Sequence, residues 1–194
     1  HFMLKEIHEQ SQSLQHCISG RLRSAEGTSV LGGLQIQPQN LAQLPHVRLI
    51  GCGTAYHAAE IGGFLIESLA RIPSLAHIAS EFRTNEPVIN PNALHFAISQ
   101  SGETADTLSA LKEIQLKGGS VHGIVNVVGS SIPRLTDAGI YTHAGPEIGV
   151  ASTKAFMGQM LVLYILCLKL AYERKEIDKK TFSFKVKSLL ELSK

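Results

Sequence analysis

Short apolar runs alternate with longer segments of helical character along most of the chain, and this alternation predicts its fold. The runs typical of strands are 47–53, 75–79, 94–99, 121–126 and 140–143. The segments typical of helices are 55–70, 104–117, 153–174 and 179–192. Strands that alternate with helices at this spacing predict an α/β domain, a three-layer αβα sandwich around a parallel sheet of about five strands.

The first 46 residues follow a different pattern. Residues 1–20 have apolar positions at helical spacings and end at Gly20, which predicts one helix or two shorter pieces. Residues 21–45 are rich in Gly, Ser, Gln and Pro, which predicts a connecting stretch with an edge strand around 34–36. We therefore expect an N-terminal helix and linker, 1–46, that packs on a main domain, 47–194.

Composition and charge narrow the class of protein. The 194 residues are enough for one large domain, and the hydrophobic share of 44% is enough for a sizeable core. The formal net charge is only +2, and the basic residues are scattered, so no nucleic-acid partner is expected.

The cysteines and the apolar runs bear on where in the cell the protein is expected. Cys17, Cys52 and Cys167 are an odd number without paired spacing, so we expect free thiols and a cytoplasmic protein. The apolar run Ala155–Leu168 is shorter than the ~20 residues that span a bilayer, which predicts a buried helix and no membrane. The chain begins at His1 without the pattern of a signal peptide, and we expect it to be a segment of a longer protein.

Ligands of open parallel sheets bind beyond the carboxyl ends of the strands, so the turns there carry the candidate chemistry. The turn Gly51–Ala55 suggests a dinucleotide site, but Tyr56 stands where the glycine fingerprint requires a third glycine, and the alternative is a tight turn. Cys52 in this turn is either a small core residue or a nucleophile that His57 activates.

The turn after the third predicted strand is the strongest candidate. Its hydroxyl and amide side chains lie within six residues, together with one glycine: Ser99, Gln100, Ser101, Gly102 and Thr104. We expect the hydroxyls and the amino end of the following helix to bind a phosphate dianion, with Gly102 letting the backbone approach the ligand. The alternative is an ordinary helix start, with Ser101 and Thr104 as capping residues.

A third turn, 145–154, joins the last strand to the long helix. Either Ser152 or Thr153 would cap that helix, but two glycines and Glu147 are more than a cap requires. The sequence lacks the GxSxG elbow of a Ser-His-Asp hydrolase. Its histidines are dispersed without metal-ligand spacing, so we expect no metal, and several lie within predicted strands as half-buried residues.

Four motifs together resemble one family, the sugar isomerase (SIS) domain. They are 51–54 (GCGT), 80–83 (SEFR), 99–107 (SQSGETADT) and 147–156 (EIGVASTKAF). The chain is most similar to the first SIS module of the glucosamine-6-phosphate synthase family, and its opening ten residues resemble the segment that joins the glutaminase domain to the isomerase half there. The resemblance implies a flavodoxin-like fold.

The resemblance also implies a function. Members of that family convert fructose 6-phosphate and glutamine into glucosamine 6-phosphate without a metal or an organic cofactor. By motif, the sugar phosphate would be held by Ser99, Gln100, Ser101 and Thr104, and the sugar would contact Thr54, Val150 and Ser152. The implied partners are the two sugar phosphates, a second SIS module, a glutaminase domain and a second copy in a homodimer.

Two departures from the family limit this expectation. Ala55 stands where the family often has a serine, which removes one sugar contact. The catalytic groups belong to the second module and a C-terminal tail, and Lys154 does not match the Schiff-base position. We therefore expect no catalytic residue here and no turnover by the chain alone.

Two alternatives remain open. One is a non-catalytic sugar-phosphate sensor, which would carry a helix-turn-helix domain that we do not find in the sequence. The other is a free-standing SIS ketose/aldose phosphate isomerase, for which Glu147 with His143 or His57 are the only candidate catalytic groups.

Overall fold

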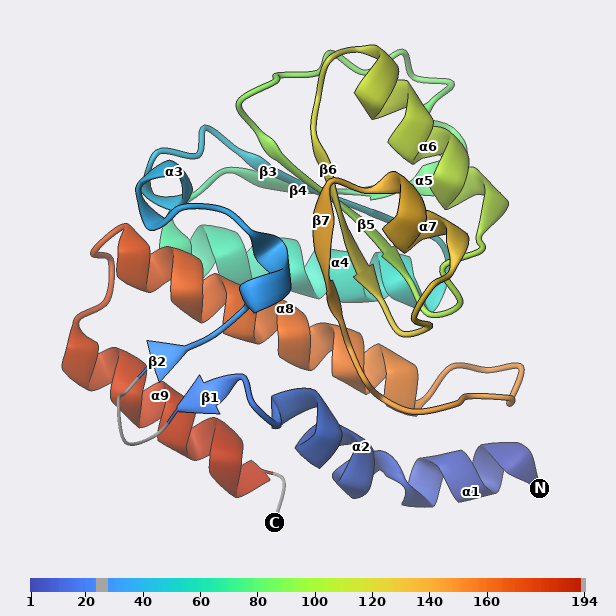
Figure 1. Ribbon diagram of the computed structural model, residues 1–194, viewed down its shortest axis with the longest axis vertical. Coiled ribbons are helices and arrows are strands. Elements are labelled where there is room, and N and C mark those ends of the chain that lie inside the picture. The colour runs from blue at the N-terminus through green and yellow to red at the C-terminus, as the bar shows by residue number, and fades with distance from the viewer. Residues whose placement is uncertain (24–27, 193–194) are drawn as a thin grey trace.

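A five-stranded parallel sheet forms the centre of the computed structural model, which describes residues 1–23 and 28–192 (Figure 1). Its strands are β3 (Val47–Gly51), β4 (Ser74–Ile78), β5 (Leu94–Ser99), β6 (Val121–Val125) and β7 (Ala138–Tyr141). Their order in the sheet is β4-β3-β5-β6-β7, and every neighbouring pair is parallel. The five predicted strands are confirmed, with ends displaced by a few residues.

The central strands are buried on both faces, which explains their nearly continuous apolar sequences. Every residue of β5 and β6 is buried, including one histidine on each, His95 and His122. Burial lowers the pKa of His95 to about 4, so this ring is neutral at pH 7. Histidines within the sheet were predicted, and these two are buried more deeply than expected.

Helices cover both faces of the sheet, as the αβα prediction requires (Figure 1). One face carries α3 (Pro38–Ala42), α4 (Thr54–Leu65) with its π-helical extension η2 (Ile66–Ala70), and α8 (Lys154–Glu173). The other face carries α5 (Ala79–Phe82), α6 (Ala105–Leu116) and α7 (Ser131–Leu135). The short helices α3, α5 and α7 were not predicted, because four or five residues do not complete a recognisable helical period.

Helix α8 is enclosed from two sides, which explains why it is apolar around its whole circumference. The helices α2 (Gln10–Ile18) and α9 (Lys179–Leu192) pack on the side of α8 that faces away from the sheet, through Cys17, Leu161 and Phe182 among others. By length and composition α8 could cross a membrane, but 67% of its apolar window is buried inside the protein. The buried helix predicted around 155–168 is confirmed.

The N-terminal segment begins with α1 (Phe2–His8) and α2, so of the two alternatives predicted, one helix or two shorter pieces, the second is found. It continues with an antiparallel pair, β1 (Leu22–Arg23) and β2 (Thr28–Ser29), and a 3-10 turn, η1 (Gly32–Leu34). The edge strand predicted around 34–36 is wrong, because Leu34 is buried in the core and Gln35 adopts a left-handed backbone with φ 51°. The turn η1 lies against β7, and a Cβ atom on Gly33 would be 2.2 Å from the Gly139 carbonyl oxygen.

Candidate functional site

The candidate site lies where the order of the sheet reverses. The chain passes from β3 to β4 on one side and then to β5 on the other, which leaves a crevice beyond the ends of β3 and β5. A pocket of about 160 Å³ occupies this place. It is lined by Cys52, Thr54, Ala55, Ser99, Gln100, Ser101, Thr104 and Gln159. Five of the eight predicted site residues therefore line one pocket, and they come from two separate turns.

The Ser99 turn, residues 99–104, is braced by its own hydroxyl groups. The Ser99 hydroxyl is buried, accepts a hydrogen bond from the Gly102 N–H at 3.0 Å, and lies 2.9 Å from the Thr104 hydroxyl. The Ser101 hydroxyl accepts the Glu103 N–H at 3.1 Å. These short-range contacts brace the turn from within, and the Gly102 carbonyl also accepts the Ile132 N–H at 2.9 Å from the segment after β6.

Helix α6 begins at this turn without a side-chain cap. Thr104 occupies the N-cap position, yet no side-chain hydrogen bond caps the helix, since the Thr104 hydroxyl contacts Ser99 instead. The capping alternative is therefore wrong for Thr104. The positive end of the α6 dipole is left facing the pocket, which is the arrangement that anion sites at helix N-termini share.

The charges around the pocket are compatible with an anion. All eight residues that line it are uncharged. The nearby Glu103 carboxylate accepts the Ser131 N–H at 2.8 Å, and hydrogen bonds from Ser131 lower the pKa of Glu103. The carboxylate is thereby bound to the first residue of α7. An anion in the pocket would be held by hydroxyl, amide and backbone donors alone.

The structure explains why a glycine stands at position 102, for a reason that the sequence did not indicate. Its φ is +70°, and a Cβ atom there would be 1.9 Å from the Ser130 hydroxyl and 2.8 Å from a Val125 methyl group. The glycine is required because the turn packs tightly against the loop that follows β6. This packing, more than the approach of a ligand, accounts for the residue.

The Gly51–Ala55 turn supplies the other wall of the pocket. Thr54 is the exposed first residue of α4, and Ala55 is buried beside it. Cys52 is partly buried and packs against the core on the α6 side of the sheet. His57, the histidine that would activate Cys52, is exposed and lies 3.0 Å from Glu60. These contacts favour the structural interpretation of Cys52.

No residue of the third predicted turn lines the pocket, although the turn lies next to the Ser99 turn, to which Asn126 joins it. In the loop 145–153, Val150 is fully exposed, and the Ser152 hydroxyl donates to Glu147 at 2.9 Å. Glu147 also accepts the N–H groups of Thr153 at 2.8 Å and Ala155 at 3.2 Å. The cap predicted from Ser152 or Thr153 is therefore supplied by the Glu147 carboxylate.

Asn126 was missed by the sequence analysis, although it connects the two turns. Its backbone N–H donates to the Gln100 carbonyl at 3.2 Å, and its side-chain Nδ2 donates to the Gly145 carbonyl at 2.7 Å. Its Oδ1 accepts the Thr142 hydroxyl at 2.9 Å and the Ala144 N–H at 2.8 Å. The available signal was a polar side chain directly after a buried strand.

Gln159 was missed as well. It lies on α8, is 1% exposed and lines the pocket, and its Oε1 atom has no hydrogen-bond partner. A buried amide oxygen without a partner is uncommon in folded proteins and calls for an explanation. The sequence offered only the signal of one glutamine within an otherwise apolar helix.

The catalytic groups of the free-standing isomerase alternative do not come together. Glu147 caps α8, His57 contacts Glu60, and the His143 ring lies 6.0 Å from that of Tyr141. Across residues 1–23 and 28–192, neither histidine contacts Glu147, whose carboxylate bonds to Ser152, Thr153 and Ala155 instead. The same residues contain no group of three side chains that could hold a metal ion.

Comparison with known proteins places these observations in a family. Residues 40–185 match the model of the SIS domain. Glutamine–fructose-6-phosphate aminotransferase (isomerizing) of Chlorobaculum tepidum is 51% identical over 174 residues, which are 90% of this chain and 28% of the relative. The enzyme of the same name from Bacteroides thetaiotaomicron is 49% identical over 92% of this chain and 29% of the relative.

A solved structure agrees with these relatives. The C-terminal domain of glucosamine-fructose-6-phosphate aminotransferase from Francisella tularensis has a TM-score of 0.91 and 35% identity, covering 98% of this chain and 54% of that domain. The chain thus spans less than a third of the length of the curated relatives named above and about half of this solved domain.

Proposed function

Because this chain belongs to the SIS domain family, we propose that it binds the phosphate end of fructose 6-phosphate and glucosamine 6-phosphate through the Ser99 turn. The observation that carries the proposal is the convergence of Ser99, Ser101 and Thr104 on one uncharged pocket at the reversal point of the sheet. Such a pocket satisfies a phosphate with hydroxyl donors and a helix N-terminus, and needs no metal.

We further propose that the chain is the phosphate-binding half of an isomerase domain that makes glucosamine 6-phosphate from fructose 6-phosphate and glutamine. The names of its relatives support this assignment, since the two curated relatives described above are both isomerizing aminotransferases. In this proposal the second SIS module and the glutaminase domain supply the catalytic groups, and the assembly is a cytoplasmic homodimer. The chain alone should bind sugar phosphates without turning them over.

A thermal-shift series tests the binding site. Wild-type protein is heated with fructose 6-phosphate, glucosamine 6-phosphate, inorganic phosphate or NAD. A ligand at about 100 times its dissociation constant should add ~2.7 kcal/mol, which raises Tm by several degrees. We expect shifts from the sugar phosphates and none from NAD.

The matched variants are Ser101→Ala and Ser188→Ala. Ser101→Ala removes a hydroxyl from the pocket and should reduce the shift strongly. Ser188→Ala removes an exposed hydroxyl on α9 that donates to the Phe184 carbonyl, so it should leave the shift unchanged. No shift with any sugar phosphate, or equal shifts in both variants, would contradict the proposed site.

A further inference from the structure

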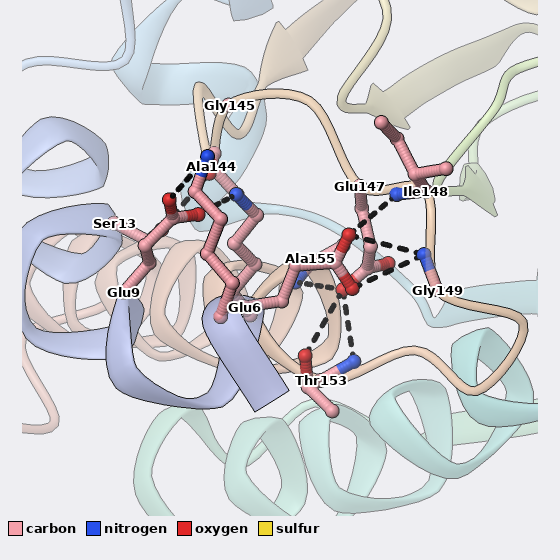
Figure 2. A network of polar contacts seen from close by, with 12 residues as sticks. Glu6, Glu9, Ser13, Ala144, Gly145, Glu147, Ile148, Gly149, Thr153 and Ala155 are labelled. Atoms are coloured by element: carbon pink, nitrogen blue, oxygen red, sulfur yellow. Dashed lines mark hydrogen bonds and ion pairs between the residues drawn. The ribbon is translucent and has the colours of Figure 1, made fainter. Parts of the chain in front are cut away.

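The N-terminal helices hold the loop 145–153 at several points along its length (Figure 2). The Ser13 hydroxyl donates to the Ala144 carbonyl at 2.9 Å, just before the loop. Just after the loop, the Lys154 ammonium lies 2.6 Å from Glu9. Between them, Glu6 contacts the middle of the loop. Residues more than 130 positions apart in the chain are thereby brought into direct contact.

Glu6 makes the central contact. Its Oε1 accepts the Ile148 N–H at 2.6 Å and the Gly149 N–H at 3.0 Å, and its Oε2 lies 3.2 Å from the latter nitrogen (Figure 2). The Glu6 side chain is 3% exposed although it carries a charge. Buried carboxylates are retained where charged hydrogen bonds compensate for the loss of water, and here the compensation comes from this loop.

The loop is shaped to receive this carboxylate. A Cβ atom on Gly149 would be 2.5 Å from the Glu6 Oε2, so any other residue there would push the Glu6 carboxylate out of its present position. The backbone hydrogen bonds from Ile148 and Gly149 also lower the pKa of Glu6, which keeps it ionised at neutral pH. Glu6 and the loop residues Ile148 and Gly149 therefore fit one another both sterically and electrostatically.

The hydrogen bonds to Glu6 use only backbone groups, and the side chains at the tip of the loop, residues 148–150, stay available for other interactions. The Ile148 side chain is 64% exposed, and Val150 is fully exposed. Asn126 fixes only the start of the loop, through Ala144 and Gly145. The position of the tip therefore depends on Glu6, which belongs to α1, and on Glu147, which belongs to the loop itself.

We propose that α1 belongs to the sugar-binding site, with Glu6 as the positioning residue that holds Val150 and Ser152 where the sugar end of the ligand would meet them. The inference rests on the function proposed above, and adds that the segment before the SIS-matched residues contributes to affinity. When a binding-competent arrangement is only partly populated, the apparent dissociation constant rises by the inverse of its population. Loss of the Glu6 contact should therefore weaken sugar binding and spare phosphate binding.

The test compares two ligands by isothermal titration calorimetry. Wild-type protein, Glu6→Ala, Glu6→Gln and His8→Ala are each titrated with glucosamine 6-phosphate and with inorganic phosphate. For Glu6→Ala we expect the dissociation constant of the sugar phosphate to rise about tenfold, as for a competent population of about one tenth, and that of phosphate to change less than about twofold. Glu6→Gln retains one acceptor oxygen and should restore part of the loss.

His8→Ala is the matched control, because His8 is an exposed residue of the same helix, and it should bind both ligands as the wild type does. If Glu6→Ala fails to fold, the titrations of Glu6→Gln test the inference by themselves. A selective loss of affinity for the sugar phosphate is still expected for that variant. Equal loss for both ligands, or no loss, overturns the inference. A wild-type chain that binds neither ligand contradicts the proposed function itself, and the inference falls with it.

Discussion

The Ser99 turn and the loop 145–153 lie at the same end of the sheet, but they are held in different ways. The Ser99 turn is fixed by hydrogen bonds among residues 99–104 and by the packing of Gly102 against Ser130. The loop 145–153 depends on Glu6 and Glu9 from the N-terminal helices. The comparison indicates that the phosphate end of the proposed site is held by the turn itself and by the segment 126–132, whereas its sugar end depends on helices more than 130 positions away in the chain.

The largest expected effect comes from disrupting the Ser99 turn with Gly102→Ala. The left-handed backbone costs about 1–2 kcal/mol and the clash with Ser130 about 1–3 kcal/mol, so we expect a loss of roughly 2–5 kcal/mol in the free energy of unfolding. Urea denaturation measures it. Gly118→Ala is the control, because φ is +81° there but no atom lies within 4 Å of the added Cβ. Equal losses in the two variants would show that packing against Ser130 is unimportant.

A smaller effect is expected from separating the two regions with Asn126→Ala. The variant removes three side-chain hydrogen bonds and leaves the Thr142 hydroxyl, the Ala144 N–H and the Gly145 carbonyl without this partner. We expect a loss of about 2–3 kcal/mol in stability, since a buried unsatisfied group costs about 1–3 kcal/mol. Hydrogen exchange should accelerate at Ala144 while Gly102 stays protected. Equal acceleration at both amides would mean that the regions are not held separately.

The smallest effect on stability is expected for Gln159→Met, which tests the pocket itself. The Gln159 Oε1 is buried without a partner, so replacing the amide by an apolar side chain of similar size should change the stability by less than about 1 kcal/mol. The affinity for glucosamine 6-phosphate should nevertheless fall about tenfold, the equivalent of one hydrogen bond of ~1.4 kcal/mol. Urea denaturation and titration calorimetry on the same samples measure the stability and the affinity. An unchanged affinity would show that Gln159 does not contact the ligand.

The sequence predicted most of the fold because the central strands are buried on both faces and therefore read as nearly continuous apolar runs, such as 94–99. It also predicted the Ser99 turn, since the hydroxyls and the helix they precede are neighbours in the chain. It failed at η1, where the burial of Leu34 decides the local conformation. It could not indicate Glu6 or Asn126, because their roles depend on contacts between residues far apart in the sequence.

The 3-10 turn η1 also has a consequence for the outer edge of the sheet. The last strand in the order is β7, and an uncovered edge strand offers its backbone groups to strands of other molecules. Gly33 lies so close to the Gly139 carbonyl that η1 shields this margin sterically. The turn η1 thus protects this edge from edge-to-edge aggregation, and a version shortened to begin at Val47 would lose that protection.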